Sequence, residues 1–408
     1  YPSGKLLAHV LGQVDMDNKG LAGLEKSLDA RLSAGEDITL SIDAGVQAVV
    51  AREIARQMEV FEAIGGAGVM LDIHSGEVVA MVSLPDYNPN HFAAIEDDAR
   101  FNRATLGLYE MGSTFKVLNT AIALESGATT TSSYYEVSKP LRFGRFSVWD
   151  YHMYDRDLSV PEILVLSSNI GSARMAADIG AERQQFYLRQ LGLFDKVSLE
   201  IPEMANPLVP GTWRSTSIAT VSYGHGISVT PLHLASSVAA ASGSGAIVEP
   251  TLMHRGGAPA PMSERLFSEE TTKAVRSMMR LVVSHPDGTG NFAEAKGYMV
   301  GGKTGTSEKI NPDGGYFKDK NIASFAATFP VHDPRYVLVV MVDEPKGQKH
   351  SYGYATGGWV AAPAAKRIIE HAAPLLGILP VDENSPEIRQ KLRLDFKIGK
   401  EEKTLASY

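Results

Sequence analysis

Hydrophobic positions recur at helical spacing in several long segments of the chain. Residues 44–61, AGVQAVVAREIARQMEVF, place apolar side chains on one helical face. The segment STFKVLNTAIALESG begins at Ser113, a favourable N-cap residue, and ends at Gly127, a common stop signal. Further helices are predicted at 230–245, 268–284 and 360–377. The middle of the chain, from about 113 to 284, is therefore expected to be mainly helical.

Shorter apolar runs predict strands before and after this helical part. VMLDI and VVAMVS are joined by HSGE, which is typical of a hairpin turn, and DITLSI at 37–42 is a further short strand. The last third contains YMVGGKTGT, IASFAATF and RYVLVVMV, with a loop expected at 307–320. Short links favour antiparallel pairing. The pattern predicts an α/β fold of the α+β type: a five-stranded, mainly antiparallel sheet covered by helices, with a helical subdomain.

Composition narrows the possible functions. The 408 residues are 44% hydrophobic and 21% charged, as in a soluble globular protein, and the net charge is −8. Lys and Arg are dispersed, which argues against nucleic acid as a partner and against a polybasic membrane patch. The absence of cysteine excludes disulfides and thiolate metal sites. The eleven histidines are scattered without a His-Glu-x-x-His motif, so no metal site is predicted.

One stretch, GYMVGGKTGTSEK at 297–309, fits two different chemistries. Gly297, Gly302, Lys303 and Thr304 match the phosphate loop of a nucleotide-binding protein. That loop requires a buried strand before it and a helix directly after its Lys-Thr pair. Here another glycine and the segment NPDGGY follow, so the phosphate-loop alternative lacks its structural context.

The other chemistry is serine acyl transfer, which predicts further residues elsewhere in the chain. MGSTFK supplies Ser113 and Lys116, the only Ser-x-x-Lys of the sequence. One turn apart at the start of a helix, they would lie over the same face, with the serine at the positive end of the helix dipole. Lys116 can take the proton of Ser113 only if its pKa is lowered, by burial or by a second cation.

A second segment, LSSNIG, supplies a hydroxyl and an amide. Ser167 and Asn169 would point the same way on a strand or an extended loop. In one cleft, the hydroxyl could relay a proton and the amide could hold a substrate carbonyl. Taken alone, Ser-x-Asn is more often a turn or a helix cap.

The Lys-Thr-Gly-Thr segment completes the predicted site. Lys303 would be a second cation that attracts a substrate carboxylate and lowers the pKa of the first lysine. Gly305 would let a substrate backbone come close. The N–H groups of Ser113 and Thr306 are candidate oxyanion donors. Strict alternation places Lys303 and Thr304 on opposite faces of a strand, so both reach one ligand only if the edge is twisted or the ligand lies beside it.

Together, Ser-x-x-Lys, Ser-x-Asn and Lys-Thr-Gly are the three signatures of penicillin-binding proteins and serine β-lactamases, and the chain resembles them. The likeness extends to the flanks, from about residue 1 to 376. AGLEKSLD, LSIDAGVQ, SGEVVAMVSLPDYNPN, SYGHGISVTPLHLA and KTGTSEK are similar to the class B, monofunctional transpeptidases. Within that class they most resemble the division-specific group, penicillin-binding protein 3.

The resemblance implies a peptidoglycan D,D-transpeptidase that works through a serine acyl-enzyme during septal cell-wall synthesis and is acylated by β-lactams. It implies three catalytic residues and five substrate-binding residues: Ser113, Lys116 and Ser167, and Asn169, Lys303, Thr304, Gly305 and Thr306. Implied partners are stem peptides, β-lactams and membrane proteins of the division complex, including a glycosyltransferase. The implied location is the periplasmic face of the inner membrane, with one N-terminal anchor outside this chain. No cofactor is implied.

The resemblance also divides the chain into three parts. Residues 1–36 would be the remnant of an N-terminal non-catalytic (pedestal) domain, 37–376 the transpeptidase domain, and 377–408 a polar C-terminal tail. Met111 stands where the family usually has proline, which changes the start of the helix but no reacting group.

Two alternatives share the same acylation site. A serine β-lactamase would hydrolyse the acyl-enzyme rapidly, but those enzymes are much shorter, and no residue is identified to activate the water. A β-lactam sensor or a division scaffold would retain the triplet without turnover, but the sequence shows no signalling partner domain.

Overall fold

A five-stranded antiparallel sheet forms the centre of the computed structural model, which describes residues 1–408 except 95, 145, 262, 393–395, 399–400 and 404–408. The strand order is β4-β3-β11-β10-β9, and every neighbouring pair is antiparallel. The strands are β3 (Gly65–Asp72), β4 (Val78–Leu84), β9 (Gly301–Ile310), β10 (Tyr316–Phe329) and β11 (Tyr336–Asp343). The predicted five-stranded sheet is confirmed, and the edge strand β9 carries the Lys-Thr-Gly-Thr segment.

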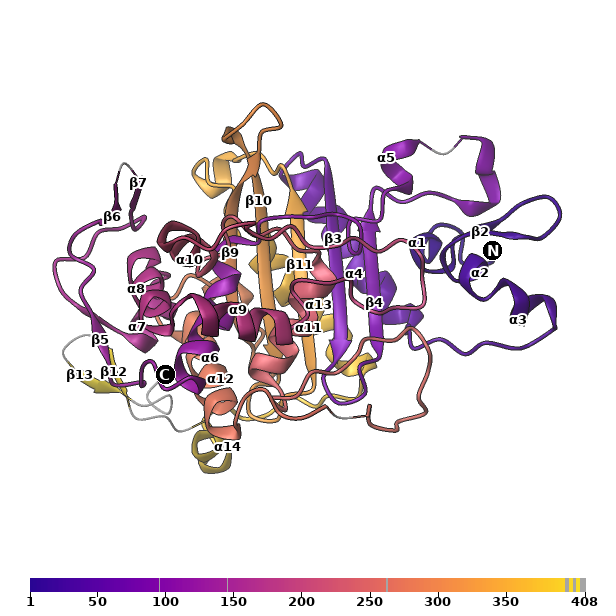
Figure 1. The fold of residues 1–408 in the computed structure, drawn as a ribbon. Helices are drawn as coiled ribbons and strands as arrows, with labels where there is room; N and C mark the ends of the chain where they lie inside the picture. Colours follow the sequence, from indigo (N-terminus) through magenta and orange to yellow (C-terminus); the bar gives the residue numbers. More distant parts are fainter. Residues whose placement is uncertain (95, 145, 262, 393–395, 399–400, 404–408) are drawn as a thin grey trace.

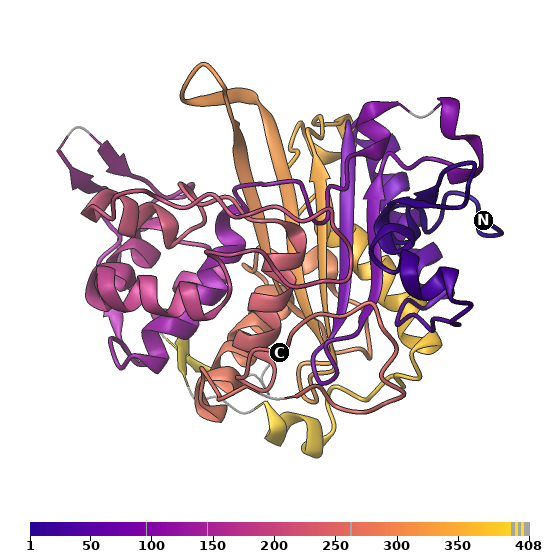
Figure 2. The same cartoon turned by 45° about the vertical axis from the view of Figure 1, so that its right-hand side comes forward.

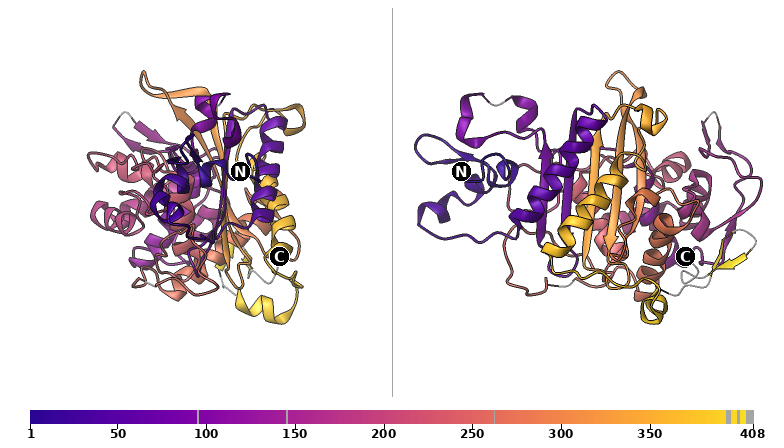
Figure 3. Two further views of the ribbon diagram at one scale, coloured as in Figure 1. Left: turned by 90° about the vertical axis from the view of Figure 1, so that its right-hand side faces the viewer. Right: turned by 180° about the vertical axis from the view of Figure 1, so that it is seen from behind.

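Helices cover both faces of this sheet. On one face, α4 (Ala44–Val60) packs against β3 and β4, and α13 (Ala361–Leu375) packs against α4, β10 and β11 (Figure 3). On the other face, α11 (Pro231–Ser242) lies against β3, β10 and β11, and α12 (Glu269–Ser284) lies against β9 (Figure 1). Because both faces are covered, every residue of β3, β4 and β11 is buried.

The boundaries of these helices follow from capping residues in the sequence. Asp43 accepts a hydrogen bond from the backbone N–H of Val46 at the start of α4 (2.9 Å). Thr230 and Ser268 cap α11 and α12 in the same way. Each cap satisfies a backbone donor that the helix cannot pair internally. The long helices predicted from periodicity therefore begin within a residue or two of their expected positions.

A helical subdomain lies beside the β9 edge of the sheet (Figure 2). Its helices are α6 (Phe115–Glu125), α7 (Val160–Val165), α8 (Asn169–Ile179), α9 (Ala181–Gln190) and α10 (Ser215–Val221). The subdomain also contains short strands that sequence analysis missed: β5 (Tyr134–Tyr135), β6 (Leu141–Phe143), β7 (Phe146–Val148) and β8 (Leu158–Ser159). The cleft described below opens between this subdomain and the sheet.

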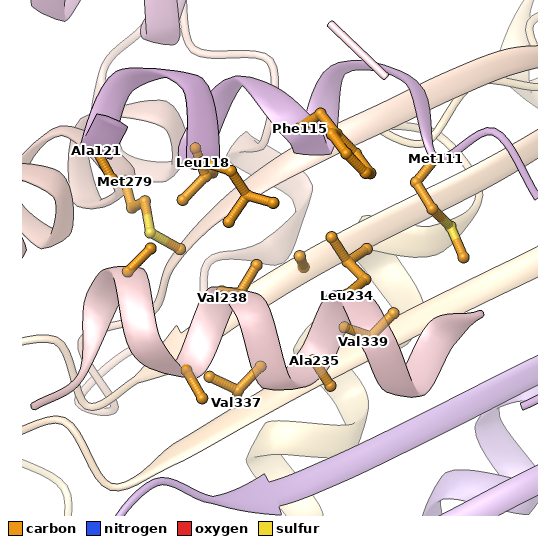
Figure 4. Close-up of a cluster of buried hydrophobic side chains, with 14 of the residues drawn as sticks. Met111, Phe115, Leu118, Ala121, Leu234, Ala235, Val238, Met279, Val337 and Val339 are labelled. Carbon is orange, nitrogen blue, oxygen red and sulfur yellow. The ribbon is translucent and has the colours of Figure 1, made fainter. Parts of the chain in front are cut away.

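The main hydrophobic core joins the subdomain to the sheet (Figure 4). Phe115 and Leu118 of α6 face Leu234 and Val238 of α11, and on its other side α11 packs on β11. A second cluster fills the space between the sheet and α4 and α13. The segment that carries Ser113 is therefore anchored through α6 to the largest apolar cluster of the protein.

The N-terminal segment packs beside β4 as short elements: α1 (Ala8–Leu11), β1 (Gln13–Val14), β2 (Gly20–Ala22), α2 (Gly23–Ser27) and α3 (Asp29–Ser33). Other short elements are η1 (Pro89–Ala94), α5 (Asp97–Arg100), η2 (Gly112–Thr114), η3 (Asn291–Ala293), η4 (Lys349–Ser351), α14 (Pro386–Lys391), β12 (Phe396–Ile398) and β13 (Glu401–Lys403). Within the described residues, no helix combines the length and the hydropathy that a bilayer crossing requires.

The segment after α13 packs against α12 and the residues that precede β9. Glu383 accepts hydrogen bonds from the backbone N–H of Gly297 (2.9 Å) and from the guanidinium of Arg280 (3.1 Å). Ile388 and Leu392 are buried in the main core. Part of the tail at 377–408 lies outside the described residues, but its first half packs against the body of the protein.

Two local predictions were wrong. Residues 37–42 do not form a strand, because only Leu40 pairs, through an isolated bridge to Met253. The segment 307–320 is not one long loop. Strand β9 continues to Ile310 and β10 begins at Tyr316, so a two-stranded hairpin extends beyond the rest of the sheet (Figure 2). Its polar residues give no alternating hydrophobic signal.

Replacing Ile368 by Ala should lower the free energy of unfolding by about 2–5 kcal/mol, because the side chain is fully buried between α13 and the sheet. Guanidinium unfolding measures the change. Leu375→Ala on the same helix is the control, since that side chain is 54% exposed. Equal losses in the two variants would contradict the assigned packing of α13.

Candidate active site

A cleft of about 660 Å³ lies between the helical subdomain and the edge strand β9. Its lining combines side chains from three distant segments of the sequence: Ser113, Ser167, Asn169, Thr304 and Thr306. Lys116 and Lys303 are fully buried behind this lining. The structure therefore brings together the three motifs that the sequence separates by up to 190 residues.

Ser113 lies in the turn that leads into α6. The prediction that it is the N-cap is wrong: it belongs to the 3₁₀ turn η2, and the helix proper begins at Phe115 after Thr114. The expected geometry nevertheless holds, because the turn runs directly into the helix. Lys116 lies one turn later, and its Nζ donates a hydrogen bond to Ser113 Oγ at 3.0 Å.

The amino group of Lys116 also contacts the second motif. Its Nζ lies 2.6 Å from the carbonyl oxygen of Ser167, 3.1 Å from Ser167 Oγ and 2.7 Å from Asn169 Oδ1. No water can surround the side chain, because Lys116 is completely buried. The amine thus connects the two hydroxyl groups of Ser113 and Ser167 at hydrogen-bond distance, which is the arrangement that proton transfer between them requires.

Burial changes the acidity of both lysines. Desolvation lowers the pKa of Lys116 from 10.5 to about 7, and the nearby negative charge of Asp150 opposes this shift. Desolvation also lowers the pKa of Lys303 well below its usual value, with the charge of Lys116 as the second cause. Burial is thus the main cause of the low pKa of Lys116, and the repulsion between the two amines, which acts on both of them, is a further contribution.

Asp150, which sequence analysis missed, positions the second motif. Its carboxylate accepts hydrogen bonds from Ser168 Oγ (2.6 Å) and from the backbone N–H groups of Asn169 (2.5 Å) and Ile170 (2.9 Å) at the start of α8. Acidic groups are favourable at that end of a helix. No motif spacing indicates this role, because Asp150 lies 19 residues before Asn169, with β8 and α7 between them.

The second motif is neither a strand nor an extended loop, contrary to prediction. Ser167 has a positive φ of 61°, Ser168 caps α8, and Asn169 is the first helical residue. The turn is held by the hydrogen bond from Gly171 N–H to Ser168 Oγ (2.9 Å). Ser167 and Asn169 still reach the same amine, because the chain reverses between them.

The third motif lies within β9, and no helix follows it. Lys303 is buried, and its Nζ approaches Thr304 Oγ1 (3.3 Å) and Thr289 Oγ1 (3.4 Å). The long lysine side chain reaches the hydroxyl of its neighbour, although strict alternation places the two residues on opposite faces. Since a phosphate loop requires a helix directly after the lysine, the strand excludes the phosphate-loop alternative.

Gly305 and Thr306 pack against neighbouring loops. A Cβ at Gly305 would lie 2.4 Å from the carbonyl oxygen of Met111 and 2.3 Å from Ser324 Oγ. The glycine therefore makes room for the turn before Ser113, a role that sequence analysis did not foresee. Thr306 Oγ1 accepts a hydrogen bond from the backbone N–H of Gly357 at 3.0 Å.

Three backbone segments meet directly beside Ser113. Gly112 has a φ of 55°, and a Cβ there would lie 2.6 Å from the carbonyl oxygen of Thr306. On the other side, a Cβ at Gly224 would lie 2.2 Å from the carbonyl oxygen of Gly112. The turn before Ser113 is thus held between β9 and the loop at 222–229 by close backbone contact that only glycine permits.

Glu110, which sequence analysis also missed, holds the turn before Ser113 in place. Its Oε1 accepts hydrogen bonds from the backbone N–H of Gly226 (2.7 Å) and from the hydroxyl of Tyr316 (3.0 Å). Burial raises the pKa of this carboxyl group. Tyr223 and His225 pack around this contact and do not line the cleft.

Aromatic side chains form the outer part of the cleft. Tyr151 approaches from the subdomain, while Tyr354 and Trp359 come from the loop after β11 and Phe292 from η3. The Trp359 ring is 4.9 Å from that of Phe292 and stacks on that of Tyr354 at 6.5 Å. Over the described residues, no group of three or more His, Asp or Glu side chains is suited to hold a metal ion.

Comparison with known proteins identifies the family of this fold and site. The family model described as "Penicillin binding protein transpeptidase domain" matches residues 66–370. A protein of Caulobacter vibrioides named "Probable peptidoglycan D,D-transpeptidase FtsI" is 40% identical over 389 residues, covering 93% of this chain and 66% of the relative. The "Peptidoglycan D,D-transpeptidase FtsI" of Escherichia coli K12 is 32% identical, covering 93% and 68%. The chain thus spans about two thirds of these relatives.

A solved structure agrees with this assignment. Penicillin-binding protein 3 of Mycobacterium tuberculosis, in complex with aztreonam, superposes with a TM-score of 0.83 at 28% sequence identity. The match covers 94% of this chain and 91% of that one. The similarity therefore includes both the sheet and the helical subdomain that enclose the cleft.

Gly224→Ala should slow the acylation of the protein by a fluorescent penicillin by roughly tenfold or more, because the added methyl group displaces the turn before Ser113. The rate of labelling under excess penicillin measures the effect. Gly192→Ala is the matched control: its φ of 74° gives the same backbone strain, but no atom lies within 4 Å of its Cβ. Equal slowing in both variants would show that strain, not the contact with Gly112, matters.

Proposed function

The chain belongs to the penicillin-binding protein transpeptidases, a family of serine acyl-transfer enzymes of peptidoglycan synthesis, and from this premise we propose that it cross-links stem peptides through an acyl-enzyme on Ser113. The contact between Ser113 Oγ and the buried amine of Lys116, at 3.0 Å, carries this proposal. A neutral amine at that distance can take the hydroxyl proton as the serine attacks.

Acylation would proceed as follows. Lys116 accepts the proton of Ser113, and Ser113 Oγ forms a bond to the carbonyl carbon of the penultimate D-Ala. The backbone N–H groups of Ser113 and Thr306 stabilise the oxyanion. The bond to the terminal D-Ala then breaks, and its nitrogen takes a proton from Ser167, which recovers one from Lys116. The contacts of Lys116 with both hydroxyl groups support this route.

Deacylation would complete the cross-link. The amine of a neighbouring stem peptide attacks the ester carbonyl, Ser113 leaves as the alkoxide, and a proton returns to it through Lys116. The new amide bond replaces the bond that was broken in the first step. No free-energy source beyond the first peptide bond is needed.

The remaining motif residues would bind the substrate. Lys303, with the hydroxyl groups of Thr304 and Thr306, would hold the terminal carboxylate of the donor stem peptide, and Gly305 would keep β9 close to the turn before Ser113. Asn169 would hold a substrate carbonyl through its amide Nδ2, which in the free protein donates to the carbonyl oxygen of Trp149 (3.1 Å). Its Oδ1 orients Lys116 at the same time.

The same relatives support a proposal for the biological setting. Because they include enzymes named FtsI, we propose that this protein acts in septal cell-wall synthesis, with β-lactams as inhibitors that acylate Ser113. Peptidoglycan lies outside the inner membrane, so the proposed location is the periplasmic face of that membrane. Membrane proteins of the division complex, including a glycosyltransferase, are the proposed partners.

Benzylpenicillin should add its mass to the peptide that contains Ser113, and the adduct should persist for minutes. Mass spectrometry of a protease digest maps the modified residue and its lifetime. Ser113→Ala should give no adduct, whereas Ser126→Ala, at the far end of α6, should be labelled like the wild type. Labelling of Ser113→Ala would overturn the assignment of the nucleophile. Release within seconds would instead identify a β-lactamase.

The rate of acylation should rise with pH and level off above about pH 7, the pKa of Lys116. Below that pH the amine is protonated and cannot accept the serine proton, so the rate should fall about tenfold for each pH unit. Stopped-flow acylation by a chromogenic cephalosporin measures the profile. A rate that is independent of pH between 5 and 8 would exclude Lys116 as the base.

A further inference from the structure

A second groove lies behind the aromatic wall of the cleft, on the face covered by α4 and α13. It has a volume of about 280 Å³ and is lined by side chains from four elements, among them Arg56, Phe61, Phe292, His350, Trp359 and Arg367. We call it the α4–α13 groove. None of the motifs identified in the sequence lies in it, and the proposed chemistry does not use it.

The α4–α13 groove adjoins the catalytic cleft. Phe292 and Trp359 line both cavities, and their rings lie 4.9 Å apart. Trp359 is 7 residues after Tyr352, whose ring packs against it edge-on at 5.9 Å. Phe292 and Trp359 thus form a ridge with the reacting groups on one side and the groove on the other. An extended chain that leaves the cleft over this ridge enters the groove.

Charge in the α4–α13 groove favours an anion. Arg56 is exposed there and forms no ion pair or hydrogen bond with any described residue. Arg367 donates its Nε to Glu53 at 2.7 Å, but its Nη2 is buried without a partner. Glu53 also binds Arg52, so its charge is already shared between two guanidinium groups. The acidic side chain of nearby Glu62 pairs with Lys346.

These features match one class of ligand. Guanidinium groups bind carboxylates through paired N–H donors, and the guanidinium of Arg56 is both accessible and unpaired. Phe61, Phe292 and Trp359 provide apolar surface for the stem of the ligand. An acidic peptide in an extended conformation, which spans about 3.3–3.6 Å per residue, can fill the cleft and the groove at once.

We propose that the α4–α13 groove binds a carboxylate of the stem peptide, upstream of the bond that reacts at Ser113, through Arg56. This inference rests on the proposed transpeptidase function and adds a determinant of substrate choice to it. A peptide that places a carboxylate in the groove is held at two points, so its reacting carbonyl is oriented towards Ser113. A penicillin reaches only the cleft and does not use the groove.

Two synthetic peptide thioesters that end in a D-alanyl thioester test this inference. They are identical except that the upstream carboxylates are free in one and converted to carboxamides in the other. The wild-type protein should release thiol from the acidic peptide with a kcat/KM about three- to tenfold higher than from the amidated peptide. Arg56→Glu should abolish this preference and Arg56→Gln should reduce it. Acylation by benzylpenicillin should be unchanged in both variants.

Arg265→Glu is the matched control, because Arg265 is exposed, lies outside the groove and gives the same change in net charge. It should keep the wild-type preference. Equal loss of preference in Arg265→Glu and Arg56→Glu would indicate a long-range effect and overturn the inference. So would a wild-type protein that does not distinguish the two peptides, or an Arg56→Glu variant that still prefers the acidic one. Failure of benzylpenicillin to acylate the wild type would overturn the proposed function itself, and this inference with it.

Discussion

The burial of the Lys116 amine is the constraint on which the rest of the site depends. Lowering its pKa from 10.5 to about 7 corresponds to roughly 5 kcal/mol in favour of the neutral amine. An unfolded chain keeps the ordinary pKa, so between these two values it binds more protons than the folded protein. The loss of stability is therefore complete below about pH 7 and diminishes as the pH rises towards 10.5. The large core that joins α6, α11 and the sheet offsets this cost.

The buried amine lies where three segments that are far apart in sequence meet, and it forms hydrogen bonds with two of them. Ser113 lies in a turn held between β9 and the loop at 222–229. Ser167 lies before α8 in a left-handed conformation, and Lys303 lies in an edge strand. Each support is itself fixed by backbone contacts or by a buried carboxylate, as Asp150 does for α8. A site assembled this way has its reacting groups in place without a substrate, which is the condition for stabilising a transition state without reorganisation.

The predictable part of this protein is the part encoded by local pattern. Long periodic segments with good caps, such as α4 and α12, were found from sequence, and so were the strands whose residues are mainly apolar. The outer hairpin of β9 and β10 was missed because its polar residues pair through the backbone and bury little. Asp150 and Glu110 were missed for another reason: their partners are 19 and 116 residues away, and no spacing rule connects them. The motif residues themselves were recognisable because chemistry, not packing, restricts their identity.

The aromatic ridge of Phe292 and Trp359 shows why an enzyme with this site would extend beyond its reacting groups. The serine of such a site can be acylated by any small amide or lactam that fits the cleft. The two lysines and the two oxyanion donors provide little selection among such compounds. Binding energy taken from a distant part of a long substrate can instead be used to orient the reacting carbonyl. The positively charged groove beyond the ridge is positioned to supply that energy, since it begins where the cleft ends and offers the one guanidinium of its lining, Arg56, that no described residue neutralises. Substrate selection and chemistry would then take place in two adjoining cavities that share Phe292 and Trp359.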